Sequence, residues 1–438
     1  GDNGLIHNKV PFREAINFWL KLGFIGFGGP AGQISLMHTE LVERKKWISE
    51  NHFLHALNYC MMLPGPEAQQ LATYMGWLLH GTKGGIIAGT LFIIPSLLLM
   101  VVLSWVYIAY GEVKAISGIL YGFKPAVVAI VAYAVIRIGQ KTLKNGLAVF
   151  LAVFAFCALY FFKIPFPVII ISAGIIGWAA SHFGNKPLSN NPANNPAQNP
   201  NSNESLIIDN ADMDAHLKPS RDRMISHLLV GAALWAVPIL LLTVWQSWQG
   251  TFTQMGWFFT KVALVTFGGA YAVLPYVAQN AINYNWLIPG QMIDGLALGE
   301  TTPGPLIKIV AFVGFLGALQ VTEFGMPGAV LGAVVATYFT FLPSFLFILI
   351  GAPFIEASRA MTWLSAALSG ITAAVVGVIF NLGVFFGSHV FIPKSGGIDF
   401  AAVLIAIAAF IGMWQWKWNI IYVVFGAGLI GMCYRLIV

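Results

Sequence analysis

Charged residues are scarce in this chain. Asp, Glu, Lys and Arg make up 9% of its 438 residues, whereas an ordinary soluble domain carries about 25%. Hydrophobic residues make up 58%, and apolar stretches recur that reach the length of about 20 residues needed to span a bilayer. The composition predicts an all-α polytopic membrane protein. Its formal charge of +6 is therefore no sign of a nucleic-acid partner.

Cysteine is also rare, which excludes several kinds of site. The three cysteines, Cys60, Cys157 and Cys433, lie in apolar segments, and none belongs to a CxxC pair. They predict neither a disulfide framework nor a metal centre. The chain lacks a Walker A motif, so we do not expect it to hydrolyse ATP. We see no haem, flavin, Fe–S or zinc ligand set, expect no cofactor, and regard an intramembrane enzyme as a weaker alternative than a transporter.

One polar segment interrupts the apolar pattern. Residues 184–226 contain the run NKPLSNNPANNPAQNPNSNESL, whose Asn- and Pro-rich, low-complexity composition is typical of a disordered linker. It divides the chain into an N-terminal repeat, residues 1–183, and a C-terminal repeat, residues 227–438, which begins with one extra helix. The polar start of the chain shows no cleavable signal peptide.

The two halves repeat one another in the same order. FWLKLGFIGFGGPAG at 18–32 matches FFTKVALVTFGGAYA at 258–272, and MLPGPE at 62–67 matches TTPGPL at 301–306. Further along, Pro95 matches Pro343. Internal repeats with Gly/Pro breaks in corresponding segments indicate a secondary transporter whose binding site lies near the bilayer midplane. A channel is a weaker alternative, because such repeats favour alternating access.

Together, the Phe-Gly-Gly and Pro-Gly-Pro motifs of both halves resemble the chromate ion transporter family in its long, two-domain form. The resemblance covers the chain outside the linker, with one departure at Ala270, where the first half has Pro30. It implies two repeats of inverted topology and secondary active export of chromate, a tetrahedral dianion. Coupling to a proton gradient is expected. Uptake or exchange of sulfate or another tetrahedral oxyanion is the alternative, because the sequence does not set the direction.

The resemblance also bears on the cellular location and the binding partners of the protein. We expect a multi-pass protein of the bacterial inner membrane, with the lipid bilayer, a chromate or sulfate-like oxyanion and a coupling proton as partners. A homodimer is one arrangement that such a carrier can adopt.

The Gly/Pro breaks are the predicted anion site. Where a new helix begins after a break, its first N–H groups have no intrahelical acceptor and its dipole is positive. Such a terminus binds oxyanions, and glycine lets an anion approach the backbone. Four such tips could surround one tetrahedral anion. The competing interpretation is that the breaks serve only kinks and close packing. The residues predicted at these tips are Gly28, Gly29, Pro64, Gly65, Pro66, Gly268, Gly269, Pro303, Gly304 and Pro305.

Polar residues near the breaks are candidates for substrate and proton contacts, because a charge inside the membrane is costly. Lys308 and Lys124 could offset the charge of a dianion, although an ion pair between Lys308 and Glu300 competes with that role. Glu67 and Glu300 are the proton-coupling candidates, although Glu67 also simply complements a helix dipole. We expect Asp294 near the base of a hairpin. The neutral donors predicted for the oxyanion are Gln69, Gln70, Thr301 and Thr302.

The distribution of positive charge bears on topology. If every apolar segment crosses from a cytoplasmic N-terminus, the cluster Arg44-Lys45-Lys46 falls outside, against the positive-inside rule. If the motif segments are re-entrant hairpins, the cluster stays inside, and limbs of about 18 Å reach the midplane without crossing. We favour the hairpins, with the N-terminus and linker cytoplasmic and the C-terminus outside. Both schemes invert the second half.

Overall fold

The fold is helical throughout the part of the chain that the structure describes. The computed structural model describes residues 10–26, 29–184, 219–267, 270–357 and 362–438. Within these ranges the regular secondary structure contains no strand, and seven helices are long and apolar enough to cross a membrane. The expectation of an all-α, multi-pass membrane protein is therefore confirmed.

The first half consists of short helices followed by longer ones. Its longest helix is in fact two limbs, because His80 and Gly81 have non-helical dihedral angles and the chain turns there. Gly76 on the first limb packs directly against Gly84 on the second. In order, the elements are α1 (Phe12–Ile25), α2 (Gly29–His38), the π-helical turn η1 (Thr39–Arg44), α3 (Glu50–Met62), α4 (Glu67–Tyr110), α5 (Lys114–Thr142), α6 (Gly146–Tyr160) and α7 (Phe166–Phe183).

The second half has the same sequence of elements after one additional helix. Gly314 packs against Gly332, as Gly76 does against Gly84, so α12 and α13 form the counterpart of the two limbs of α4. The elements are α8 (Arg221–Gln246), α9 (Thr251–Val265), α10 (Ala270–Asn283), α11 (Pro289–Glu300), the 3₁₀ turn η4 (Leu306–Lys308), α12 (Ile309–Val321), α13 (Gly325–Ala357), α14 (Thr362–Phe391), α15 (Phe400–Gln415) and α16 (Ile420–Ile437).

The predicted linker, residues 184–226, extends too far at its C-terminal end. Helix α8 begins at Arg221, and the side chain of Ser220 caps it by accepting a hydrogen bond from the Arg223 backbone N–H at 3.4 Å. Serine is a favoured N-cap residue, which explains a helix start inside a polar segment. Residues 185–218 of the predicted linker lie outside the described part of the chain.

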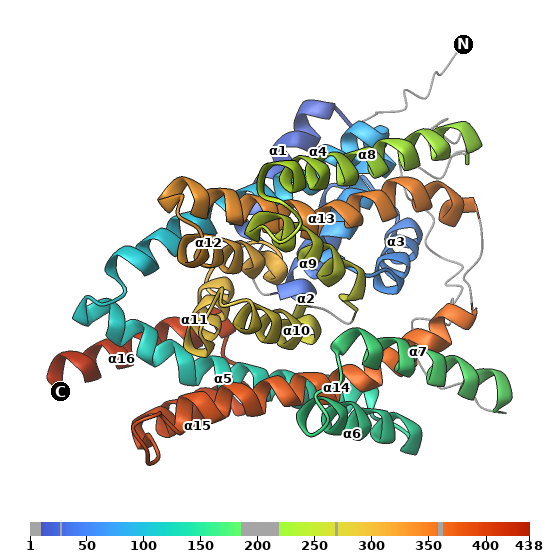
Figure 1. The fold of residues 1–438 in the computed structure, drawn as a ribbon. Helices are drawn as coiled ribbons and strands as arrows, with labels where there is room; N and C mark the ends of the chain where they lie inside the picture. The colour runs from blue at the N-terminus through green and yellow to red at the C-terminus, as the bar shows by residue number, and fades with distance from the viewer. Residues whose placement is uncertain (1–9, 27–28, 185–218, 268–269, 358–361) are drawn as a thin grey trace, which may run out of the picture.

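The two halves of the sequence are interleaved in space. Helix α5 of the first half packs against α15 and α16 of the second, while α14 of the second half packs against α6 and α7 of the first. The counterparts α4 and α13 also pack together, as do α5 and α14. Figure 1 shows α4, α8 and α13 on one side of the molecule and α5, α6, α14 and α15 on the other, with α10 and α11 between them. Neither half forms a body of its own.

Small residues make this interleaving possible. At the contact between α5 and α16, a Cβ on Gly122 would collide with the backbone oxygen of Ala427. One turn earlier, a Cβ on Gly118 would lie 2.7 Å from the Cα of Met432. Inside a membrane, burial of apolar surface does not drive helices to associate. Helices there commonly pack through small residues four apart, which let the backbones approach closely.

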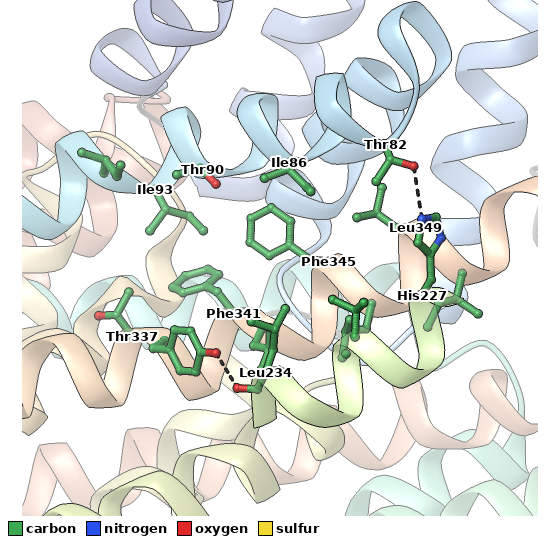
Figure 2. Close-up of a pocket in the computed structure, with 17 residues that line it drawn as sticks. Thr82, Ile86, Thr90, Ile93, His227, Leu234, Thr337, Phe341, Phe345 and Leu349 are labelled. Carbon is green, nitrogen blue, oxygen red and sulfur yellow. Dashed lines mark hydrogen bonds between the residues drawn. The ribbon is translucent and has the colours of Figure 1, made fainter. Parts of the chain in front are cut away.

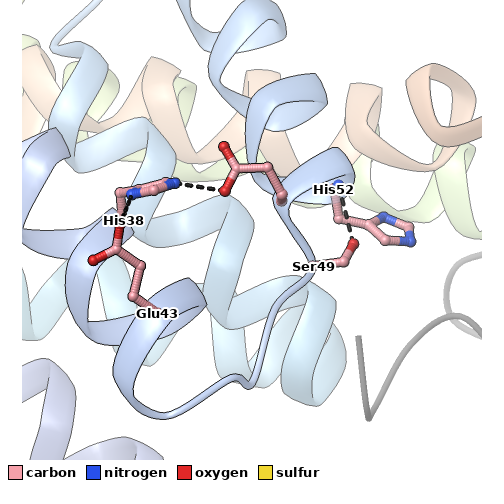
Figure 3. A network of polar contacts seen from close by, with 5 residues as sticks. His38, Glu43, Ser49 and His52 are labelled. Carbon is pink, nitrogen blue, oxygen red and sulfur yellow. Dashed lines mark hydrogen bonds and ion pairs between the residues drawn. The ribbon is translucent and has the colours of Figure 1, made fainter. Parts of the chain in front are cut away.

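The basic cluster Arg44-Lys45-Lys46 lies at the end of η1 and the start of the loop to α3, and polar contacts at the protein surface fix this loop. Figure 3 shows the ring of His38 between two carboxylates, 2.7 Å from Glu50 and 3.6 Å from Glu43. Next to it, the Ser49 hydroxyl accepts a hydrogen bond from the His52 backbone N–H at 3.2 Å and caps α3. The loop is thereby anchored at both ends.

Candidate functional site

Both Pro-Gly-Pro motifs interrupt the helices, as predicted. Helix α3 ends at Met62 and α4 begins at Glu67, while α11 ends at Glu300 and the chain resumes in η4. Gly65 and Gly304 have φ angles of 125° and 98°, a region that L side chains adopt only with strain. Helices α3 and α11, of 13 and 12 residues, rise roughly 20 Å, less than the roughly 30 Å hydrocarbon core of a bilayer. Whether their segments are re-entrant stays a prediction.

Each Pro-Gly-Pro turn is bonded to the other half of the chain. The Gly65 N–H donates to the carbonyl of Thr266 at 2.7 Å, and the Gly304 N–H donates to the carbonyl of Gly26 at 2.9 Å. Gly26 and Thr266 are matching residues that directly follow the last residues of α1 and α9. The two bonds are therefore reciprocal, and each half completes the site of the other.

Each turn also packs against a buried serine from the other half of the chain. A Cβ on Gly65 would lie 2.7 Å from the hydroxyl oxygen of Ser344, and a Cβ on Gly304 would lie 2.7 Å from the Cβ of Ser96. Both serines are buried, and the Ser344 hydroxyl has no hydrogen-bond partner in the described structure. These serines were not among the predicted site residues, although each directly follows one of the matched prolines, Pro95 and Pro343. That position was the available signal.

Gln33 is a further residue that the sequence analysis missed. Its side chain is completely buried, and its amide nitrogen donates to the carbonyls of Gly26, at 2.7 Å, and Gly304, at 2.5 Å. It thus bridges the end of α1 and the second Pro-Gly-Pro turn. The matching residue is Val273, so the bridge exists on one side only. No sequence pattern marks Gln33, because both of its partners are backbone atoms.

The predicted donors Gln69 and Gln70 are fully buried in the first turn of α4. The amide nitrogen of Gln70 donates to the Pro64 carbonyl at 2.8 Å, and that of Gln69 donates to the Thr73 hydroxyl at 3.2 Å. An amide nitrogen carries two hydrogens, so one N–H of each glutamine remains for another acceptor. Gln70, which was predicted as a donor to the oxyanion, therefore also stabilises the first Pro-Gly-Pro turn.

The predicted donors Thr301 and Thr302 use their hydroxyls locally. Thr301 donates to the Leu298 carbonyl at 2.9 Å, and Thr302 donates to the Gly299 carbonyl at 3.0 Å. Both bonds satisfy carbonyls at the C-terminal end of α11 that have no intrahelical donor. The hydroxyl groups thus close the end of the helix in this structure.

Lys308 is buried, with 2% of its surface exposed, and its ammonium group faces the backbone of the second turn. It donates to the carbonyls of Thr302, Pro303 and Gly304 at 2.9, 3.0 and 3.2 Å. A lysine ammonium has three hydrogens, so these bonds use all of its donors. This geometry fits a lysine that holds the turn better than one that contacts the anion directly.

Lys124 belongs to a polar group that the sequence did not predict. Its ammonium nitrogen lies 3.7 Å from a carboxylate oxygen of Asp294, and the Tyr107 hydroxyl donates to the other oxygen at 2.7 Å. The three residues come from α5, α11 and α4. Asp294 is 3% exposed and lies among packed helices; its expected place near the base of a hairpin stays a prediction. Its partners are far away in sequence, so no local pattern could place it.

The remaining candidates flank the breaks or lie outside the described residues. Glu67 is the first residue of α4 and Glu300 the last of α11, and both are half-buried. Gly29 begins α2 with a φ of 70°, and a Cβ there would have no described atom within 4 Å. Gly28, Gly268 and Gly269 lie outside the described residues. Within the described ranges, no three His, Cys, Asp or Glu side chains are grouped so that they could hold a metal ion.

Comparison with known proteins identifies the family. The sequence model described as "Chromate transporter" matches residues 13–178 and 253–432, and thus covers both halves. The chain belongs to the chromate transporter family. The resemblance drawn from the Phe-Gly-Gly and Pro-Gly-Pro motifs is therefore confirmed.

Two curated members of the chromate transporter family align along nearly the whole chain. A chromate transport protein of Pseudomonas aeruginosa is 32% identical over 421 residues, which cover 94% of this chain and 90% of that protein. A chromate transport protein of Cupriavidus metallidurans is 28% identical over 436 residues, covering 98% and 95%. No solved structure gives a significant match.

A third relative has about the length of one half. An uncharacterized transporter of Bacillus subtilis, YwrB, is 32% identical over 179 residues, which are 40% of this chain but 88% of that protein. That protein therefore has about half the length of this chain. The relatives are named as transport proteins, which favours a transporter over an enzyme for this chain.

Proposed function

We propose that this protein is a secondary active transporter that exports chromate, coupled to a proton gradient. The oxyanion binds where the turns at Gly65 and Gly304 meet the ends of α9 and α1. The observation that supports this site is the reciprocal pair of hydrogen bonds from these two glycines. It brings the predicted anion-binding breaks of one half against those of the other.

The chemistry of the turns suits a tetrahedral dianion. The first N–H groups of α4 lack intrahelical acceptors, and the helix dipole adds roughly half a positive charge there. Gln69 and Gln70, in the same turn, each keep one amide N–H. Lys308 holds the second turn in place and adds positive charge close to it. Neutral donors and backbone N–H groups let the anion bind without a permanent ion pair, so it can leave again.

In this proposal Glu67 and Glu300 couple transport to protons. Glu67 follows the Pro-Gly-Pro break of the first half, and Glu300 precedes the break of the second half. Protonation removes the negative charge of a carboxylate beside the turn and so changes the affinity of the turn for an anion. Two ligands that alter each other's affinity in this way are thermodynamically linked, as a coupled carrier requires.

Transport into inside-out membrane vesicles tests the proposal. Vesicles that contain the protein should accumulate labelled chromate when their interior is acidic, and collapse of the pH gradient should abolish accumulation. Glu67→Gln and Glu300→Gln should each uncouple the two fluxes. Vesicles from cells without the protein provide the control. Accumulation only in right-side-out vesicles, with sulfate outcompeting chromate, would instead establish the alternative of sulfate uptake.

A further inference from the structure

A groove runs along the outside of the molecule, on the outer side of helices that also contribute to the proposed substrate site. It has a volume of about 390 Å³ and lies between the second limb of α4, the extra helix α8, and α13 (Figure 2). Its lining is almost wholly apolar, with Ile86 and Ile93 from α4, Leu234 from α8, and Phe341 and Phe345 from α13. An apolar cavity of this kind holds hydrocarbon rather than water.

The groove opens towards the surface that faces lipid. Ile86, Ile94 and Val230 line it and are also exposed, so they form its mouth. Helix α8 closes it from one side, because a Cβ on Gly231 would lie 2.5 Å from the Leu346 side chain. Near the same point the Tyr338 hydroxyl donates to the Leu234 carbonyl. The groove is thus a built feature of the α8–α13 contact with a lateral opening.

One end of the groove is polar, and two basic residues lie close to it in the sequence. There Thr82 and His227 lie 3.4 Å apart, as Figure 2 shows. Lys83 follows Thr82 and is exposed, with its ammonium group 5.2 Å from the Phe12 ring, and Arg221 is exposed at the start of α8. The positive-inside rule puts these basic residues on the cytoplasmic side. Asp222 is the one acidic residue of the first turn of α8, beside Arg221 and Arg223.

The length of the groove matches one leaflet. From Thr82 to Ile94, α4 rises roughly 18 Å at 1.5 Å per residue. Half of a hydrocarbon core of roughly 30 Å is roughly 15 Å. The groove therefore extends from the polar end to about the middle of the bilayer, which is the depth that one phospholipid acyl chain occupies.

We propose that this groove binds an anionic phospholipid of the cytoplasmic leaflet. One acyl chain lies along Ile86, Leu234 and Phe345, and the phosphate of the headgroup lies between Lys83 and Arg221. Basic groups near the cytoplasmic ends of membrane helices attract anionic lipids, by about 1 kcal/mol for each Lys or Arg. Helix α8 supplies one wall and half of the charge. Phe345 directly follows Ser344 of the proposed substrate site, but lipid binding in the groove does not require that site to bind an anion.

Native mass spectrometry of the purified full-length protein tests the proposal, with dioleoyl phosphatidylglycerol and dioleoyl phosphatidylcholine as probes. The wild type should bind the first phosphatidylglycerol more tightly than phosphatidylcholine. The pair Lys83→Gln and Arg221→Gln should weaken phosphatidylglycerol binding about fivefold per charge and leave phosphatidylcholine binding unchanged. The pair Lys141→Gln and Lys144→Gln removes two exposed charges elsewhere and should change neither.

A second set of variants tests the groove itself. Ile86→Trp with Val230→Trp fills the exposed mouth and should remove the tight site for both lipids, while Leu404→Trp with Leu429→Trp, on other lipid-facing helices, should not. All four exposed positions tolerate a large side chain, and equal melting temperatures verify folding. Unchanged binding of phosphatidylglycerol in the filled variant would overturn the proposal. So would equal wild-type affinity for the two lipids, or a groove occupied by a second copy of the chain.

Discussion

Gly65 and Gly304 combine two requirements that other residue types do not meet together. Each has a positive φ, and each lies where a Cβ would contact a buried serine, Ser344 or Ser96, at 2.7 Å. Each also donates its N–H to the other half of the chain. A side chain at either position therefore disturbs the backbone conformation of the turn, the packing against the serine, and the hydrogen bond to the other half.

We predict that Gly65→Ala and Gly304→Ala each abolish chromate transport. The positive φ alone costs an alanine about 1–2 kcal/mol, and the serine contact adds to this. Chromate accumulation per amount of protein in the membrane measures the effect. Gly426→Ala is the matched control, because a Cβ there meets no described atom within 4 Å and its φ is not positive. Normal transport by both turn variants would leave the breaks as packing features only.

We predict that Lys308→Met lowers stability by about 3 kcal/mol or more, because three buried carbonyls lose a charged donor. Addition of Glu300→Gln should not restore it, since the bonds of the ammonium group are to the backbone. Thermal unfolding in detergent measures both variants, with the exposed Lys114→Met as control. A Lys308→Met protein of normal stability but with a raised apparent chromate constant would show instead that the lysine contacts substrate. Full recovery in the double variant would indicate a structural ion pair.

At the scale of helices, Lys124, Asp294 and Tyr107 tie α5, α11 and α4 together. The first half has His55 where the second has Asp294, and the second half has Thr372 where the first has Lys124. The matching positions therefore cannot form the same lysine–aspartate pair. At this place the two repeats differ in charge.

We predict that Lys124→Met destabilises the protein by about 2 kcal/mol, because it leaves a buried carboxylate with one hydrogen-bond donor. This is less than the usual figure of about 3–5 kcal/mol for breaking a buried pair, since Lys124 is one-third exposed. Lys124→Met with Asp294→Asn should recover most of the loss, because both charges are then absent. Melting temperatures of the two single variants and the double variant measure this coupling. Additive losses would show that the pair contributes nothing.

The helix breaks were predictable from sequence, but their pairing was not. Prolines flanking Gly65 and Gly304 prevent a continuous helix by local chemistry alone, and both breaks occur where expected. The bonds from these glycines to Thr266 and Gly26 join distant backbone atoms, which no residue type specifies. The partners of Asp294 were not predictable for the same reason. The local sequence shows a carboxylate in an apolar segment and not the lysine that approaches it.

The whole molecule is held together by contacts that cross between its halves. Because α5 packs on α15 and α16, and α14 on α6 and α7, the long helices of each half are covered by the other half. Separated halves would expose these faces, including the close contact of Gly122 with Ala427.

We predict that residues 1–200 and 201–438, produced as two chains, reach the membrane and transport chromate only when they are made together. Each piece alone lacks the helices that cover its longest ones. Protein amount in the membrane and chromate accumulation are the measurements, with the intact chain as control. A single piece that accumulates and transports would contradict the interleaved arrangement.

We also predict that residues 45 and 83 are cytoplasmic and that residue 323 is external. The basis is the distribution of Lys and Arg under the positive-inside rule. Lys45→Cys, Lys83→Cys and Glu323→Cys, in a chain without Cys60, Cys157 and Cys433, can be labelled with an impermeant thiol reagent. Only Glu323→Cys should react from outside in intact cells, and all three should react after permeabilisation. Strong outside labelling at position 45 would rule out a re-entrant hairpin formed by α1 and α2.

The reciprocal bonds at Gly65 and Gly304 also bear on how such a chain could arise. Two separate copies of one repeat would form both bonds as an intermolecular interface, identical on each side, and a relative of about half this length occurs in Bacillus subtilis. An identical pair must carry the same residue at both related positions, either two aspartates or two histidines. Joining the repeats in one polypeptide removes that constraint. Asp294 opposite His55, and Lys124 opposite Thr372, are differences that a duplicated and fused gene can acquire and a homodimer cannot.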